Sequence, residues 1–175
     1  KLKQGTSWNV RFRLLESRAN IAAHHLFLRT SLDFDFMNFK FQRHVVFTPN
    51  SNRFDYRIDS GDFRKSKITM TYFQIPLMLE YASNTQHPRK GFHVAAGVYG
   101  GVLISSHTKR VTENGEKLKR WDSFNLNSLR YGVTTRIGYR SLELYANYDL
   151  NDLWNRDDGG PDLQAFCFGL SLVNF

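Results

Sequence analysis

Apolar and polar residues alternate along most of this chain, and the clearest stretch is residues 129–139. Every odd position from Leu129 to Tyr139 is apolar or threonine, and every even position from Arg130 to Gly138 is polar or glycine. Successive side chains of a β-strand point to opposite faces, whereas a helix repeats its apolar residues every three or four positions. The alternation therefore predicts a strand with one apolar face and one polar face.

Residues 142–151 repeat this pattern after the dipeptide Arg140-Ser141, which is short enough for a tight turn. The two segments together predict an antiparallel hairpin. Five further segments alternate in the same way: residues 8–14, 26–36, 73–81, 92–104 and 166–172. The sequence thus predicts an all-β protein of about seven antiparallel strands joined in up-and-down order.

Alternation alone does not say whether the apolar face meets a protein core or a lipid bilayer. The longer predicted strands have about nine to thirteen residues, which is enough to cross a bilayer and exceeds the usual strand length in soluble sheets. Aromatic residues end the apolar faces, as Phe73 and Tyr81 do, and membrane barrels carry aromatic girdles at these positions. The polar faces mix Arg, Asp, Glu and Gly and contain almost no Lys. These features favour a barrel with its apolar face toward lipid and its polar face toward a narrow lumen.

The connections also alternate in length. Short ones are expected near residues 16–23, 83–90 and 140–141, and long ones near residues 40–66, 106–125 and 155–162. Bacterial outer-membrane barrels have short periplasmic turns and longer outer loops. The chain is therefore predicted to be a transmembrane β-barrel of the bacterial outer membrane.

One stretch points to a known family. Residues 72–81, with the sequence YFQIPLMLEY, resemble the YxxIPLLLxY strand of the PorT-like outer-membrane β-barrel proteins of Bacteroidota. The next segment, GFHVAAGVYGGVLISSH at residues 91–107, is similar to the following strand of that family, and residues 124–153 continue the match. The resemblance covers roughly Ser7 to the end and implies a barrel of about eight strands. The length of the chain predicts a single domain over residues 1–175. Since about seven are present and even numbers are the rule, one strand is expected to precede Lys1 or to come from another chain.

Composition narrows the function classes. The mean hydropathy is −0.46, and no run of about 18 apolar residues occurs, so a transmembrane helix is not expected. The single cysteine, Cys167, excludes a disulfide within the chain. The net charge of +8 does not indicate nucleic-acid binding, because the aromatic residues lie on the apolar faces and not among the cations.

The cations gather instead in residues 109–121, around an Asn114-Gly115 pair typical of a tight hairpin turn. We expect this hairpin to extend beyond the membrane. A solvated loop is one interpretation, and contact with lipopolysaccharide phosphates or with an acidic protein is the other. The candidate contact residues are Lys109, Arg110, Lys117, Lys119 and Arg120.

The polar faces predict ion pairs inside the lumen. Arginines there should meet carboxylates, because an unpaired buried charge is costly. The expected members are Glu80, Arg130, Arg136, Glu143 and Asp149, and Asp33 and Asp35 are expected to join them by pairing with luminal arginines.

The sequence offers little catalytic chemistry. His93, Ser105, Ser106 and His107 could form a serine–histidine pair in a lipid-modifying barrel, but no orienting acid stands at a recognisable spacing. No catalytic, metal-binding or cofactor-binding residues are predicted. Solute transport is disfavoured, because side chains fill the lumen of a barrel of about eight strands.

We therefore expect a non-enzymatic integral outer-membrane barrel. The family resemblance implies a structural or accessory subunit of an assembly in secretion or envelope biogenesis, and a barrel-embedded lipid-modifying enzyme is the alternative. The expected partners are outer-membrane lipids, including lipopolysaccharide, and other outer-membrane proteins.

Overall fold

The structure is a computed structural model that describes residues 8–22, 25–40, 45–47, 56–58, 63–84, 91–112, 117–140, 142–157 and 159–172. Its strands are β1 (Trp8–Ala22), β2 (Leu26–Lys40), β3 (Val45–Phe47), β4 (Tyr56–Ile58), β5 (Phe63–Ala82), β6 (Phe92–Thr112), β7 (Lys117–Trp121), β8 (Leu129–Tyr139), β9 (Leu142–Asp149) and β10 (Phe166–Leu172). No helix in these ranges is long and apolar enough to cross a membrane.

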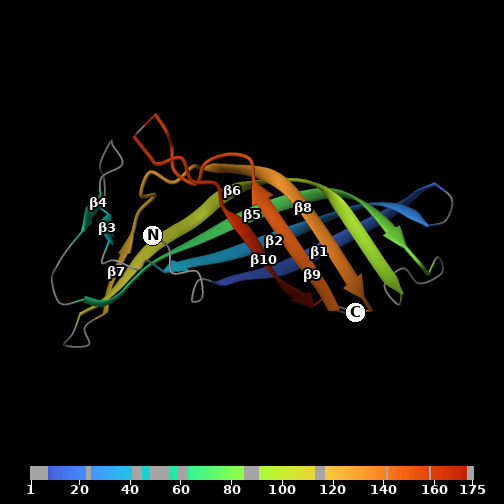
Figure 1. Ribbon diagram of the computed structural model, residues 1–175, viewed down its shortest axis with the longest axis horizontal. Coiled ribbons are helices and arrows are strands. Elements are labelled where there is room, and N and C mark those ends of the chain that lie inside the picture. Colours follow the sequence, from blue (N-terminus) through green and yellow to red (C-terminus); the bar gives the residue numbers. More distant parts are fainter. Residues whose placement is uncertain are drawn as a thin grey trace.

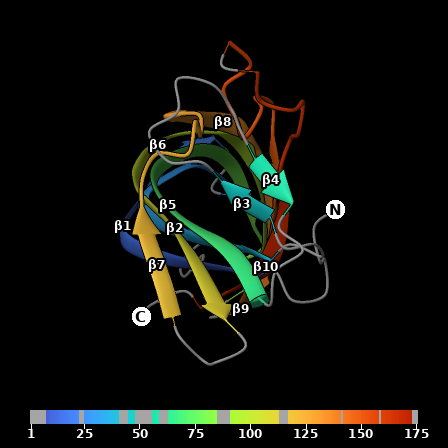
Figure 2. The ribbon, with the colours of Figure 1, turned by 90° about the vertical axis from the view of Figure 1, so that its left-hand side faces the viewer.

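Seven strands form one curved antiparallel sheet in the order β1-β2-β5-β6-β8-β9-β10, and β7 pairs with the outer part of β6. Strands that are adjacent in this order also follow one another in the chain, once β3, β4 and β7 are set aside. These three strands lie in the connections between β2 and β5 and between β6 and β8. Seen end-on, the sheet curls around a central space (Figure 2). The fold is therefore the all-β, up-and-down antiparallel barrel that the alternation predicts.

The long and short connections lie at opposite ends of the barrel. The paired strands β3 and β4 and the strand β7 are at the left end in Figure 1, and the last residues of β1 and β5 are at the right end. The end with the long connections is the outer end, following the rule for bacterial barrels. The opposite end is the periplasmic end.

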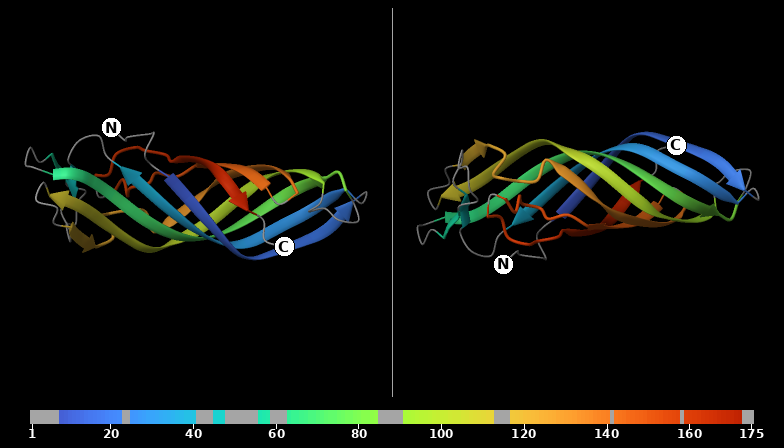
Figure 3. Two further views of the ribbon diagram at one scale, coloured as in Figure 1. Left: turned by 90° about the horizontal axis from the view of Figure 1, so that it is seen from below. Right: turned by 90° about the horizontal axis from the view of Figure 1, so that it is seen from above.

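The two edge strands, β1 and β10, approach each other where the sheet closes (Figure 3). Both strands run from the outer end toward the periplasmic end. Five strands lie between them in the antiparallel sheet, so β1 and β10 are parallel to each other. In the part of the chain that the structure describes, these two strands make no backbone ladder with each other. We call this junction the seam.

The prediction of a short connection at residues 16–23 was wrong, because residues 16–22 continue β1. A register shift between Arg13 and Leu15 places two consecutive leucines, Leu14 and Leu15, on the outside. Beyond the shift, Glu16 and Arg18 face inward where the earlier alternation would put them outside. A bulge of this kind inverts the sequence pattern, so the charged second half of the strand resembled a loop.

Strands β5 and β6 are also longer than predicted, because they extend past the membrane. From Gln74 downward, the inner face of β5 buries the polar Gln74 and Glu80 beside small or apolar residues, and the outer face is wholly apolar. From Tyr72 upward the arrangement reverses, with Ile68 and Met70 fully buried and Lys67 on the outer face. The reversal marks the level at which the surroundings change from lipid to water, since only a water-exposed sheet keeps its apolar face inside.

Candidate functional site

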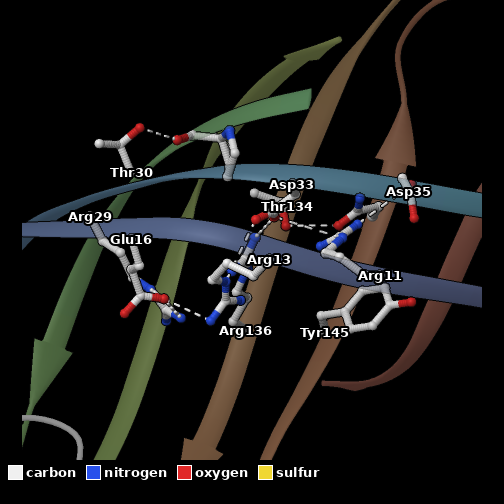
Figure 4. Close-up of polar contacts among 12 residues, drawn as sticks. Arg11, Arg13, Glu16, Arg29, Thr30, Asp33, Asp35, Thr134, Arg136 and Tyr145 are labelled. Carbon is white, nitrogen blue, oxygen red and sulfur yellow. Dashed lines mark hydrogen bonds and ion pairs between the residues drawn. The ribbon is translucent and has the colours of Figure 1, made fainter. Parts of the chain in front are cut away.

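A network of ion pairs fills the membrane-level lumen. Within the described strands, six arginines and six carboxylates take part: Arg11, Arg13, Arg18, Arg29, Arg130, Arg136, Glu16, Asp33, Asp35, Glu80, Glu143 and Asp149. Their side chains are nearly inaccessible to solvent and point toward one another from β1, β2, β8 and other strands (Figure 4). Five of these six arginines pair with carboxylates from more than one strand, and Arg11 on β1 pairs with two carboxylates of β2, so the network joins the strands of the wall across the lumen.

Glu143 on β9 connects the lower part of this network. Its carboxylate oxygens lie 2.6 Å from Arg29 Nη1, 3.0 Å from Arg13 Nη2 and 3.5 Å from Arg136 Nη1. His93 Nε2 is 3.4 Å away. One carboxylate therefore links β1, β2, β6 and β8 to β9.

Arg29 extends the lower network toward the periplasmic end. Its guanidinium also lies 2.8 Å from Glu80 Oε2 and 2.8 Å from Glu16 Oε2. Arg18 in turn lies 3.0 Å from Glu80 Oε1. These charge-assisted contacts to a fixed guanidinium fork favour a single arrangement of the side chains.

The upper part of the network is built around Arg130. This arginine lies 2.7 Å from both Asp149 Oδ2 and Asp35 Oδ2. Tyr99 donates a hydrogen bond from its hydroxyl to Asp149. Asp33 accepts from Arg136 Nη2 at 3.2 Å.

Side chains from β1 and β9 meet across the seam. Arg11 stands over the Tyr145 ring at 4.3 Å, and the Tyr145 hydroxyl donates to Asn9. Arg13 reaches Glu143 from the same side. The network therefore joins the edge strand β1 to β9, the neighbour of the other edge strand β10, by side-chain contacts across the seam.

An apolar cluster lies above the network, at the outer end. Its buried members are Met37, Ile68, Met70, Tyr72, Phe124, Leu126, Leu153, Trp154, Ala165 and Cys167. Phe124 and Leu126 come from the segment after β7, and Leu153 and Trp154 come from the loop after β9. Asn127 N donates to Leu153 O at 2.9 Å, and Asn155 N to Asn125 O at 2.9 Å, so these two loops are joined. We call this cluster with its two loops the apolar cap, and it covers the outer end of the lumen.

The five luminal residues singled out from the sequence all lie in the network. Arg130 and Asp149 form one pair, Arg136 and Glu143 form another, and Glu80 pairs with Arg29. Sequence reasoning missed Glu16 and Arg18, which it assigned to a connection. The leucine doublet before Glu16 was the signal that the alternation had shifted.

The five basic candidates of the outer hairpin do not share one face. Lys109 and Lys119 are directly paired across β6 and β7 on the outer face, whereas Arg120 pairs with Thr108 on the other face. The side chains of Arg110 and Lys117, and the Asn114-Gly115 turn, lie outside the described residues. The strands on either side of that turn do pair, from Val111↔Lys117 to His107↔Trp121.

The structure separates the catalytic candidates. His93 lies in the lumen beside Glu143, whereas Ser106 is on the inner face near the outer end and donates to the Asp122 carbonyl. Ser105 and His107 lie on the outer face, and the His107 ring packs on Trp121 at 4.6 Å between centroids. Among the described residues, no three His, Cys, Asp or Glu side chains are grouped as ligands of a metal ion.

The outer surface of the membrane-level wall is apolar. More than a third of the surface is exposed in each of four apolar residues of this wall: Val98, Val133, Leu144 and Phe168. The charged side chains of the same strands are buried inside. This is the reverse of a soluble protein and is the arrangement that a lipid bilayer stabilises.

A comparison with protein families agrees with this geometry. No curated protein and no solved structure matches the chain. The outer membrane protein beta-barrel domain matches residues 8–154, which run from the start of β1 to the apolar cap. The chain therefore belongs to the outer membrane protein beta-barrel domain family, and it is an integral protein of the bacterial outer membrane.

Proposed function

We propose that the protein is a non-conducting, non-enzymatic barrel that serves as a structural or accessory subunit of an outer-membrane assembly. The observation that carries this proposal is the filled lumen. Charged side chains occupy it at the membrane level, and the apolar cap covers its outer end. A solute would have to break several buried ion pairs to pass, each costing several kcal/mol.

With the lumen filled, the surfaces left for function are the outer wall and the outer loops. Strands β3 and β4 form a two-stranded sheet of their own, which, over the residues that the structure describes, is separate from the barrel sheet; we call this pair of strands the β3–β4 hairpin. The resemblance of residues 72–81 to PorT-like barrels of Bacteroidota supports a role in secretion or envelope biogenesis. We propose that the protein contributes a membrane anchor to such an assembly and that the hairpin contacts the other subunits.

Two measurements test this proposal. Purified protein in planar bilayers should show no steady ion conductance. When the protein is purified from native membranes in mild detergent, another membrane protein should co-purify with it in a constant molar ratio. Replacing residues 41–62 with a short Gly-Ser linker should abolish this co-purification while the barrel keeps its heat-modifiable gel mobility. The matched control is the same linker inserted within residues 85–90, between β5 and β6, and it should retain the partner.

Stable conductance steps would contradict the proposal, and so would co-purification that survives the loss of the hairpin. A modified lipid that accumulates with the intact protein and disappears with His93→Ala or Ser105→Ala would instead identify an enzyme.

A further inference from the structure

Four lysines lie side by side on the outer face of the extended sheet. The backbone register pairs Lys40 with Lys67, Lys67 with Lys109, and Lys109 with Lys119, across β2, β5, β6 and β7. Residues directly opposite in antiparallel strands have Cβ atoms about 5 Å apart. The chain thus places a lateral row of ammonium groups on one surface, which we call the lysine row.

The next row toward the membrane is polar and aromatic. It contains Asn38, Thr69, His107 and Trp121, paired in that order. Thr69 Oγ1 donates to Asn38 Oδ1 at 2.8 Å, and Lys119 Nζ lies 4.1 Å from the Trp121 ring centroid. Trp121 is 60% exposed. An exposed tryptophan beside polar groups is typical of the membrane–water interface.

The height of the lysine row fits the lipid headgroups. On β2 the lipid-facing residues run from Leu26 to Phe36, which spans about 25 Å along the membrane normal at about 3.3 Å per residue and a tilt of about 40°. Lys40 is four residues beyond Phe36, which adds about 10 Å at the same rise and tilt. Lysine side chains can reach back toward the interface from this height. The row therefore lies where the phosphates of outer-leaflet lipids lie.

The lysines repel one another in this arrangement. Burial lowers the pKa of Lys67, and the neighbouring charges of Lys109 and Lys40 lower it further. The pKa of His107 is lowered by burial and by Lys119, Lys67 and Lys109. Like charges directly opposite each other destabilise a sheet, and a polyanion bridging them would remove this cost.

We propose that the lysine row binds the phosphate groups of lipid A, the membrane-embedded part of lipopolysaccharide, with Trp121 packed against the lipid just below. The proposed lipid site lies on the outer face of β2, β5, β6 and β7. Lipid binding there does not depend on whether the protein is a subunit of an assembly. The site adds Lys40 and Lys67 to the residues that the sequence indicated, and it leaves out Arg120, which lies on the opposite face.

The test compares two double variants of the full chain in detergent micelles. Lys67→Gln with Lys109→Gln removes two charges from the row, and Arg120→Gln with Arg140→Gln removes two charges elsewhere. Bisphosphorylated lipid A and its dephosphorylated form are titrated, and native mass spectrometry measures binding. We expect the first variant to raise the Kd for bisphosphorylated lipid A about 30-fold and the second to leave it unchanged. Lys67→Arg with Lys109→Arg should retain binding, and gel mobility verifies folding of every variant.

Equal weakening by both glutamine variants would overturn the proposal, because binding would then follow total charge. Equal affinity for dephosphorylated lipid A would overturn it as well. If the lysine variant keeps its lipid A affinity but loses a co-purifying protein, the row recognises an acidic partner and the lipid proposal is wrong.

Discussion

Single residues hold this barrel together by contacting several strands at once. Glu143 is the clearest case, since three arginines lie within 3.5 Å of its carboxylate. Charged groups this deeply buried remain charged only because each has partners. Such residues are expected to be far more sensitive to substitution than charges on the loops.

Glu143→Gln keeps the size of the side chain but leaves Arg29, Arg13 and Arg136 with too little negative charge. We expect a loss of about 3–5 kcal/mol in the free energy of unfolding. Guanidinium-induced unfolding in lipid vesicles, followed by gel mobility, measures it. Asp157→Asn, on the exposed outer loop, is the control and should leave stability within about 0.5 kcal/mol of the parent. Similar stability of the two variants would show that the network contributes little.

Two glycines of β6 differ sharply in their surroundings. A Cβ at Gly97 would lie 2.1 Å from the Leu77 carbonyl oxygen and 2.6 Å from Met78 Cα, whereas a Cβ at Gly100 would meet nothing within 4 Å. Gly97→Ala would therefore push β5 and β6 apart and should cost about 1–3 kcal/mol or prevent folding. Gly100→Ala should be tolerated. The same unfolding assay compares them, and equal stability of the two variants would argue against this strand spacing.

At the level of elements, each membrane-level strand has one face toward the lumen and one face toward lipid. β8 shows this within the membrane: Arg130, Thr134 and Arg136 are buried in the lumen, while the odd-numbered residues from Leu129 to Tyr139 face lipid. A charge is tolerated on the inner face because a partner is present there. On the outer face it meets hydrocarbon, and the cost depends on depth.

This depth dependence can be tested within β8. Val133 lies near the middle of the strand and Leu129 at its outer end, and both face outward. Val133→Arg should destabilise the barrel by about 2–4 kcal/mol, and Leu129→Arg by about 0–1 kcal/mol. Unfolding in vesicles measures both. Equal costs would mean that the lipid boundary does not lie where the strand pattern places it.

The sequence predicted those elements whose alternation is uninterrupted. The predicted range of β8 agrees with the structure, and β9 was predicted to within two residues, since one face of each meets lipid along its whole length. β1 was predicted only in part, because the bulge at Leu14 reverses which positions face inward. The outer ends of β5 and β6 were missed because apolar and polar faces exchange there. The position of Glu143 in the lumen followed from alternation, but its set of partners depends on how the sheet curls, which no local pattern records.

For the whole molecule, the distribution of charge follows from the fold. Six arginines balance six carboxylates in the described lumen, so the net charge of +8 comes from the connections and the extended sheet. The lysine row was not apparent from the sequence, because its members come from four strands and only the register brings them together. Sequence reasoning named Lys109 and Lys119 among the candidates of the basic hairpin, but it did not join Lys40 and Lys67 to them.

The seam also determines the order of events when the barrel forms. Each strand of the sheet can pair with a neighbour that is close in the chain, but the contact of Arg13 with Glu143 joins residues 130 positions apart. Contacts between such distant residues form late, because the chain loses entropy when a long loop closes and gains the stabilising contact only afterwards. Until that step, an open sheet would hold its charged inner face against lipid. Closure at the seam and entry into the bilayer must therefore occur together, and the rate of insertion should depend on how fast these two edges find each other.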